Sequence, residues 1–249
     1  MNGWISTRDL DARGLRLFCL PHAGAGAAAF YQWKRLVAGR IAVCPVMLPG
    51  RESRLPEPAL RSVDAVVANL QAAVLNALDR PYAIFGHSMG ALLAFAWAQQ
   101  IARAGSRKPE ALIVSGRNAP HLLAPHRDLY RSEDDTLQAE LKKLYGESHA
   151  AVLDDEEMRK LFVPILRADI QVVETYEFNG EPKLSCPILA LAGTRDRSVS
   201  DDGLSAWAEH TSAATTTGRI EGDHFYTLDA APSGGRTQML DLLLHALKV

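Results

Sequence analysis

The sequence has few cysteines, no long apolar run and no cluster of basic residues. Its three cysteines, Cys19, Cys44 and Cys186, are isolated in apolar segments, and no two of them have the spacing of metal ligands. We therefore expect neither a metal site nor a disulfide framework. Buried thiols in a protein from a reducing compartment are the expectation.

Charge and hydropathy argue against two classes of partner. The formal net charge is −2, from 27 basic and 29 acidic residues, which is unlike the basic surface that nucleic-acid phosphates select. No apolar stretch reaches the roughly 20 residues of a membrane helix, and residues 1–11 lack the basic and apolar segments of a signal peptide. We expect a cytoplasmic, soluble protein that binds neither nucleic acid nor membrane. No exposed apolar stripe stands out, which favours a monomer.

What the sequence does contain is a regular alternation of short apolar runs and longer amphipathic segments. The apolar runs predict buried strands at 15–20, 41–47, 82–85, 111–115, 187–192 and 216–221. The amphipathic segments predict helices at 27–38, 63–78, 90–104 and 236–247. With right-handed crossovers this gives the α/β class, a mostly parallel sheet with helices on both faces. We expect residues 1–249 to form a single domain, which is common for α/β chains of this length.

One interval of about seventy residues breaks the alternation before the predicted strand at 187–192. It is helical at 136–145 and at 154–178, where Pro164 either lies in the first helical stretch or marks a kink. A single crossover needs far fewer residues, so 118–182 is an insertion. It either adds packing to the core or forms a helical lid over the carboxyl edge of the sheet, and we favour the lid.

A candidate nucleophile lies between the predicted strand at 82–85 and the predicted helix at 90–104. Residues 86–90, Gly-His-Ser-Met-Gly, match the G-x-S-x-G pattern, which forms the nucleophile elbow of α/β-hydrolases in a strand-to-helix turn. The glycines allow the tight backbone, and Ser88 lies at the positive end of the helix. A purely structural serine is the alternative, but the flanking elements favour a nucleophile. The α/β-hydrolase fold is therefore expected.

A serine nucleophile needs a base, and in this architecture the histidine follows both the nucleophile and the acid along the chain. His224 comes after the predicted strand at 216–221, in a loop preceded by glycine, where it can reach Ser88. The remaining histidines are excluded by chain order or by their predicted position: His22, His87, His121, His126, His149, His210 and His245. His224 is the predicted base.

The acid is expected after a strand that lies between the nucleophile and the base. Asp196 follows the predicted strand at 187–192 and can accept a hydrogen bond from the imidazole, which fixes the tautomer. Asp201 and Asp202 are alternatives, but we expect them to cap the next helix. Asp223 is too close in sequence to the histidine to orient its ring. Asp196 is the predicted acid.

An oxyanion hole would complete this machinery with two backbone N–H groups. One is expected from Met89, the residue after the nucleophile. The other is expected from the glycine-rich loop at 20–26, where Ala23 is the predicted donor. Such a loop could also suggest phosphate binding, but its spacing fits neither a Walker loop nor a dinucleotide fingerprint.

Several segments together resemble one family, the type II thioesterases, which are stand-alone editing enzymes of non-ribosomal peptide and polyketide synthases. The segments are Leu20-Pro-His-Ala-Gly, Leu48-Pro-Gly-Arg-Glu, Phe85-Gly-His-Ser-Met-Gly, Leu166-Arg-Ala-Asp, Glu174-Thr-Tyr, Gly193-Thr-Arg-Asp and Gly222-Asp-His-Phe. The resemblance extends from about residue 15 to residue 245. The segments at 48–52 and 166–169 are more specific than G-x-S-x-G, which a whole superfamily shares.

The resemblance implies a substrate and a role. The substrate is an acyl group joined as a thioester to the phosphopantetheine arm of an acyl or peptidyl carrier protein. The role is to hydrolyse stalled or wrongly loaded acyl groups. The family's catalytic serine, aspartate and histidine correspond to Ser88, Asp196 and His224. No cofactor is implied, because phosphopantetheine arrives on the carrier protein.

Three residues depart from this picture or lack a role in it. Family members commonly have two adjacent glycines after His-Ala, whereas here Ala25 follows Gly24, and an alanine would be strained there if the position needs a positive φ. Arg51 and Glu52 provide either a structural ion pair near the site or a substrate contact. Two other functions fit the same fold: a carboxylesterase or lipase-like enzyme, and a non-catalytic binding protein.

Overall fold

The computed structural model describes residues 3–37, 39–122, 128–146, 153–180, 183–228 and 234–249. Its centre is a six-stranded parallel sheet with the strand order β2-β1-β3-β4-β5-β6. The strands are β1 (Leu15–Leu20), β2 (Ile41–Pro45), β3 (Tyr82–His87), β4 (Leu112–Ser115), β5 (Ile188–Gly193) and β6 (Thr215–Ile220). All six strands predicted from the sequence are confirmed, with small differences at their ends.

The central strands are apolar because helices cover both faces of the sheet. Every residue of β3, β4 and β5 is buried. Successive residues of β1 alternate between two cores, with Phe18 and Leu20 in one apolar cluster and Leu17 and Cys19 in the other. The edge strand β6 is polar, and Ile220 is its only buried residue. This is the pattern of a parallel sheet enclosed between two helical layers.

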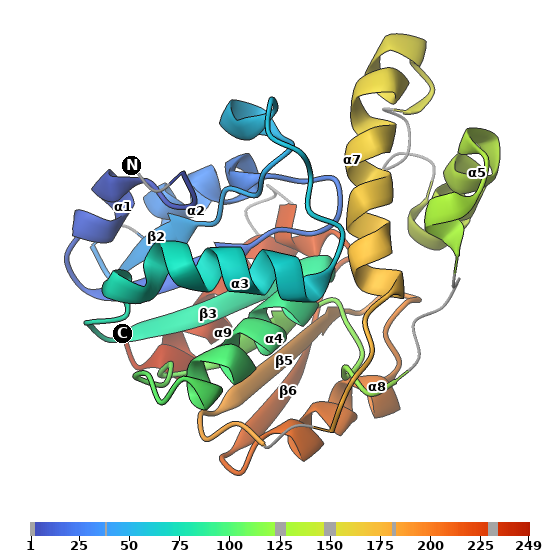
Figure 1. Ribbon diagram of the computed structural model, residues 1–249. Coiled ribbons are helices and arrows are strands. Elements are labelled where there is room, and N and C mark those ends of the chain that lie inside the picture. The colour runs from blue at the N-terminus through green and yellow to red at the C-terminus, as the bar shows by residue number, and fades with distance from the viewer. Residues whose placement is uncertain (1–2, 38, 123–127, 147–152, 181–182, 229–233) are drawn as a thin grey trace.

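The helices form these two layers (Figure 1). α3 (Val63–Val74) and α4 (Met89–Arg103) pack on one face, and α2 (Tyr31–Leu36) and α9 (Gly235–Leu247) pack on the other. The shorter elements are α1 (Thr7–Asp11), α8 (Asp201–Ser205) and the 3-10 helices η1 (Ala27–Phe30), η2 (Glu52–Arg54), η3 (Leu75–Ala77), η4 (Leu129–Arg131), η6 (Ala206–His210) and η7 (Tyr226–Leu228). The helix expected at 27–38 is divided into η1 and α2, and residue 38 lies outside the described residues.

Among the described residues between β4 and β5, where the sequence predicts an insertion, two α-helices follow η4. They are α5 (Asp134–Tyr145) and α7 (Glu156–Glu174), and α7 continues through Pro164 and contacts α4. The two helices share a small apolar cluster of their own, formed by Leu137, Leu153, Val163 and Ile170. Within 118–182, residues 123–127, 147–152 and 181–182 lie outside the described residues. Figure 1 shows α5 and α7 standing together beyond one end of the sheet.

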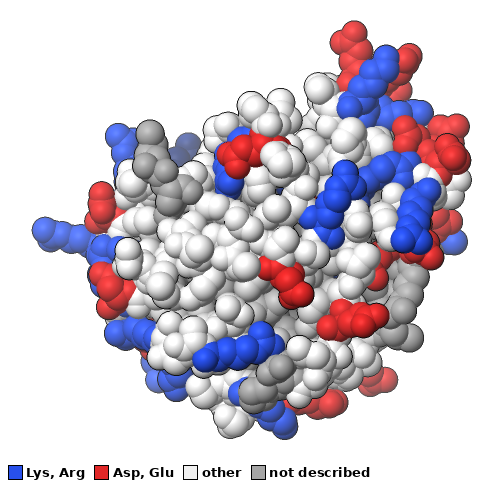
Figure 2. Space-filling model, in the orientation of Figure 1, with Lys and Arg blue, Asp and Glu red and all other residues white. Residues whose placement is uncertain are grey.

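Charged side chains are spread unevenly over the face shown in Figure 2. They gather over α5 and α7, where ion pairs such as Arg167–Asp134 and Arg159–Asp135 join the two helices. The part of this face that lies over the sheet and its covering helices carries fewer charges. The face of the insertion seen in this view is therefore rich in charged side chains.

The three cysteines are buried and unpaired, as expected from the sequence. Burial raises the pKa of Cys44 to about 12 and that of Cys186 to about 11. These thiols therefore stay protonated and unreactive at neutral pH. None of the described helices combines the length and the apolar character needed to span a membrane.

Candidate active site

Ser88 lies in the sharp turn from β3 to α4. Its φ of 56° and ψ of −114° lie in a region that residues other than glycine rarely occupy. A hydrogen bond from Ser88 N to Ser115 O at 2.7 Å holds the turn. Both flanking glycines are needed, because a Cβ on Gly86 would collide with the Gly90 carbonyl and a Cβ on Gly90 with the Leu20 carbonyl. The turn has the geometry of a nucleophile elbow.

His224 and Asp196 form a buried pair in the loops that follow β6 and β5. His224 Nδ1 lies 2.7 Å from Asp196 Oδ2, and the two residues are only 4% and 6% exposed. A backbone hydrogen bond from Arg195 N to Gly222 O at 2.9 Å ties the two loops together. The structure thus brings together the histidine and the aspartate selected from the sequence. Because Nδ1 faces the carboxylate, Nε2 is the atom available to Ser88.

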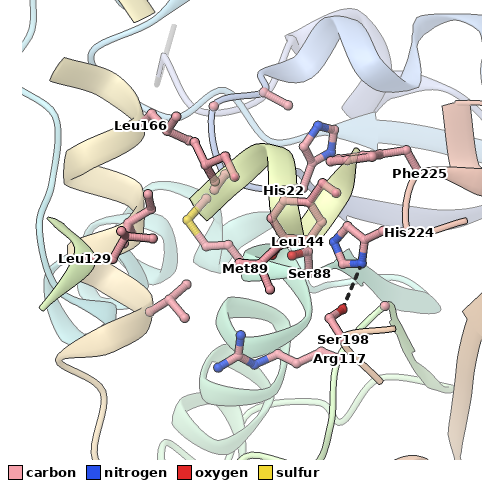
Figure 3. Close-up of a pocket in the computed structure, with 18 of the residues that line it drawn as sticks. His22, Ser88, Met89, Arg117, Leu129, Leu144, Leu166, Ser198, His224 and Phe225 are labelled. Atoms are coloured by element: carbon pink, nitrogen blue, oxygen red, sulfur yellow. Dashed lines mark hydrogen bonds between the residues drawn. The ribbon is translucent and has the colours of Figure 1, made fainter. Parts of the chain in front are cut away.

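Ser198 completes the surroundings of Asp196, and it is not among the site residues predicted from the sequence. Its backbone N–H and hydroxyl donate to Asp196 Oδ1 at 2.9 and 2.6 Å, and its Oγ lies 3.3 Å from His224 Nδ1 (Figure 3). Burial alone would raise the pKa of Asp196, but hydrogen bonds with His224 and Ser198 hold it below its usual value. Asp196 is therefore ionised at neutral pH. The sequence signal for this contact was the Asp-x-Ser spacing, which is typical of an Asx turn.

His87 is buried beside the candidate base. Its Nδ1 atom lies 2.8 Å from Ser115 Oγ, which also hydrogen-bonds with the Tyr226 hydroxyl. The centroids of the His87 and His224 rings are 5.0 Å apart. Burial, and then the proximity of His224 and His22, lowers the pKa of His87 well below its usual value. A neutral His87 adds no positive charge next to the candidate base.

The other histidines that were not predicted to be the base have different surroundings. His121 and His210 contact each other, with 2.7 Å between His121 Nδ1 and His210 Nε2. His245 lies in α9. His126 and His149 lie outside the described residues.

One expectation for the competing aspartates is wrong. Asp201 and Asp202 do not cap the next helix; the N-cap of α8 is Ser200, whose hydroxyl accepts a hydrogen bond from Gly203 N at 2.9 Å. Ser200 has the extended backbone that an N-cap requires, and the aspartates follow it in the first turn, where the helix dipole favours negative charge. The carboxylate of Asp223 accepts a hydrogen bond from a nearby backbone N–H.

The loop after β1 lies beside the candidate nucleophile. His22 and Ala23 line the same cavity as Ser88 and Met89. The two predicted oxyanion donors, the N–H groups of Met89 and Ala23, therefore belong to segments that border one space. This arrangement is compatible with the predicted oxyanion hole.

The strain considered at Ala25 does not arise. The positive φ in this loop belongs to Gly24, at 78°, and Ala25 has no positive φ. At Gly26 the constraint is space, because an added Cβ would collide with the Glu52 carboxylate. The two positions that need glycine are occupied by glycine, and alanine fits between them.

Arg51 and Glu52 hold this loop through different partners. Arg51 forms a bidentate ion pair with Asp169 of α7, with N–O distances of 2.6 and 2.8 Å, and Arg51 Nη1 also donates to Ala25 O at 3.0 Å. Arg51 and Asp169 are 5% and 2% exposed. The Glu52 carboxylate accepts hydrogen bonds at 2.9 Å from the first two N–H groups of η1. Of the two roles considered, the structural one is found.

Ser88, Met89 and His224 border a cavity of about 500 Å³ (Figure 3), a size typical of small-molecule sites. The Tyr145 ring, at the end of α5, packs on His224 with 4.7 Å between ring centroids. The insertion supplies most of the hydrocarbon lining, including Leu129, Leu141, Leu144, Leu153, Phe162, Leu166, Ile170 and Val173. It therefore forms a wall of the candidate site.

The chain matches a protein-family model described as "Thioesterase domain" over residues 15–241. It is 34% identical to gramicidin S biosynthesis protein GrsT of Aneurinibacillus migulanus, across 100% of this chain and 95% of that protein. It is 37% identical to thioesterase PikA5 of Streptomyces venezuelae, across 86% of this chain and 76% of that protein.

Two solved structures are similar over almost the whole chain. The type II thioesterase BorB from the borrelidin biosynthetic cluster has a TM-score of 0.86 and 36% identity, with 98% of this chain and 97% of that chain covered. The RedJ thioesterase from the prodiginine pathway of Streptomyces coelicolor has a TM-score of 0.85 and 33% identity, with 93% and 85% covered. The expected α/β-hydrolase fold is confirmed. The chain therefore belongs to the thioesterase family, and its similarity extends to type II thioesterases.

Proposed function

We propose that this protein hydrolyses acyl thioesters carried on the phosphopantetheine arm of acyl or peptidyl carrier proteins. It would act as the type II thioesterase of a non-ribosomal peptide or polyketide synthase and remove stalled or wrongly loaded acyl groups. The thioesterase family and the biosynthetic settings of its relatives support this substrate class.

One observation carries the proposal: the buried hydrogen bond between His224 and Asp196 lies beside the strained turn of Ser88, and both Ser88 and His224 line an apolar cavity. A serine, a base and an orienting acid supply nucleophilic catalysis. The apolar cavity can take up an acyl chain. We therefore assign Ser88 as nucleophile, His224 as base and Asp196 as the acid that orients it.

In the first half of the proposed reaction, His224 Nε2 takes the proton of Ser88 Oγ, which attacks the thioester carbonyl carbon. Asp196 accepts the Nδ1–H of His224 and stabilises the imidazolium. The N–H groups of Met89 and Ala23 stabilise the oxyanion. The C–S bond then breaks, the pantetheine sulfur takes the proton from His224, and an acyl-serine ester remains.

In the second half, His224 takes a proton from water, whose oxygen attacks the acyl-serine carbonyl. The bond to Ser88 Oγ breaks, the serine takes the proton back, and the free acid leaves. Besides the thioester, the reaction consumes only water, so the proposal includes no cofactor held by this chain. The carrier protein that brings the phosphopantetheine is the proposed partner of a monomeric enzyme.

We also assign the insertion, residues 118–182, as a lid. α5 and α7 supply the apolar wall of the cavity, and Tyr145 packs on His224. An acyl chain bound in the cavity would lie between these helices and the carboxyl edge of the sheet. Lids of this kind exclude water and shape access to a site.

Hydrolysis of an acylated carrier protein tests this assignment. Ser88→Ala should reduce kcat by about 10⁶ and Asp196→Asn by about 10⁴, whereas Ser205→Ala, an exposed position in α8, should not change it. A Ser88→Ala protein with most of its activity would contradict the triad. Faster hydrolysis of matched oxygen esters would instead indicate a carboxylesterase, and failure to react with a fluorophosphonate would indicate a binding protein.

A further inference from the structure

Arg117 is the only lysine or arginine among the described residues that line the cavity. It follows Gly116 just after β4, and β4 pairs with β3, whose end leads to Ser88. Figure 3 shows its side chain extending from near Ser198 to a position below Met89 in this view. Arg117 therefore lines the same cavity as the candidate nucleophile, and the other walls of that cavity are mainly hydrocarbon.

The backbone around Arg117 is firmly held. Gly116 N donates to Leu191 O at 2.8 Å, and Arg117 O accepts a hydrogen bond from Trp207 Nε1 at 2.9 Å. The Asn118 side chain donates to a backbone carbonyl at 3.2 Å and accepts from a backbone N–H at 3.1 Å. Arg117 is thus fixed in position by its backbone and its neighbours.

The guanidinium group itself has no partner among the described residues. Arg117 Nε is buried without a hydrogen-bond acceptor, and neither an ion pair nor another side-chain hydrogen bond engages the group within that part of the chain. Burial lowers the pKa of Arg117 to about 10, while Tyr145 and Tyr176 act in the opposite direction. The side chain is therefore cationic at neutral pH. Arg117 is half-buried, and a partly buried cation without a protein acceptor costs free energy that a ligand with an acceptor atom can offset.

We propose that Arg117 binds an oxygen atom of the acyl chain, so that the enzyme prefers oxo- or hydroxy-substituted acyl groups to plain hydrocarbon ones. This inference rests on the proposed function for the identity of the ligand as an acyl group. The apolar wall of α5 and α7 takes the hydrocarbon part of the chain, and the N–H donors of Arg117 face a carbonyl or hydroxyl oxygen. Arg117 is then a specificity-determining residue.

Kinetics on a matched pair of substrates tests this preference. The N-acetylcysteamine thioesters of 3-oxobutanoic and butanoic acid have the same chain length, and they differ only at C3, which is a carbonyl in the first and a methylene in the second. The ratio of their kcat/KM values should fall about 10- to 100-fold in Arg117→Met, the range expected for loss of a hydrogen bond to a charged group. Because the two enzymes are compared on the same two thioesters, differences in chemical reactivity cancel.

Two further variants complete the kinetic test. Arg117→Lys keeps the charge and should give an intermediate ratio, whereas Arg107→Met, at an exposed arginine ahead of β4, should keep the wild-type ratio. If Arg117→Met leaves the ratio within about threefold of wild type, the proposal is overturned. An unchanged ratio overturns the proposal if the kcat/KM values for both thioesters fall together, as a structural role would cause, and also if neither value falls.

Calorimetric binding of the same thioesters to Ser88→Ala separates this inference from the catalytic proposal. In Ser88→Ala the 3-oxobutanoyl thioester should bind more tightly than the butanoyl thioester, and the added change Arg117→Met should abolish the difference. If the wild type hydrolyses no thioester but this preference is present, the proposed catalysis fails and the Arg117 subsite stands. Equal affinities for the two thioesters in Ser88→Ala overturn the subsite.

Discussion

Asp169 of α7 accepts a hydrogen bond from Gly24 N at 2.8 Å, although the two residues are 145 positions apart in sequence. The same carboxylate oxygen receives Arg51 Nη1 at 2.6 Å, and Arg51 in turn donates to Ala25 O. One carboxylate in the insertion thus fixes the loop that contains the proposed donor Ala23. The shape of the proposed oxyanion hole therefore depends on the position of α7.

Replacing Asp169 with alanine should lower both stability and turnover. The change leaves Arg51 buried without its counter-charge, which costs about 3–5 kcal/mol of unfolding free energy. It also removes the acceptor of Gly24 N, so the loop loses its fixed position. Urea unfolding measures the first effect, and kcat on an acyl thioester measures the second.

A double variant separates the two effects. Asp169→Leu combined with Arg51→Met replaces both charges with apolar groups of similar size, which should recover much of the stability. Turnover should stay low, because Gly24 N still has no acceptor. If turnover recovers together with stability, the loop does not depend on Asp169.

Features that depend on neighbouring residues could be predicted from the sequence, whereas contacts between residues far apart in the chain could not. The strands and the turn at Ser88 depend on local patterns, and the carboxyl ends of parallel strands bring Asp196 and His224 to one edge. The pair of Arg51 and Asp169 joins residues 118 positions apart, and no local pattern indicates such a partner. The family resemblance included the segments that contain Arg51 and Asp169, but it did not show that these two residues form an ion pair.

The N-cap of α8 and the role of Ser198 were missed for local reasons. At the start of α8, three polar residues in a row could each cap the helix, and the sequence alone does not decide among them. The structure selects Ser200, which precedes both aspartates. The role of Ser198 could have been predicted, because in turns an aspartate carboxylate often accepts hydrogen bonds from the residue two positions later.

Lowering the pH should destabilise the fold through His210. This residue is 5% exposed, and burial, followed by the nearby His121, lowers its pKa to about 4. In the unfolded chain a histidine has a pKa of about 6.5. Between these values the unfolded state binds a proton that the folded state does not, so stability falls as the pH decreases. Through this residue, the free energy of unfolding changes by at most about 1.4 kcal/mol per pH unit.

Denaturant unfolding at several pH values between 7 and 4 measures this slope. His210→Gln cannot take up the proton, so its unfolding free energy should depend less on pH than that of the wild type. His245→Gln, at an exposed position on α9, is the control and should keep the wild-type slope. Parallel curves for the wild type and His210→Gln would contradict the assignment.

Tyr145 connects the insertion to the candidate base. It is the last residue of α5, and its ring centroid lies 4.7 Å from that of His224 and 5.6 Å from that of Phe225. Tyr145→Ala removes the surface on which the imidazole rests, and a base displaced by about 1 Å can cost about 100-fold in rate. We expect kcat on an acyl thioester to fall by about 10- to 100-fold.

Tyr145→Phe is the matched control for this change. It keeps the ring and removes only the hydroxyl, so kcat should stay near the wild-type value if ring packing positions His224. The Ala variant should also react more slowly with a fluorophosphonate, because Ser88 activation depends on the same base. If the Phe variant loses as much activity as the Ala variant, the hydroxyl rather than the ring positions the base, and the packing argument fails.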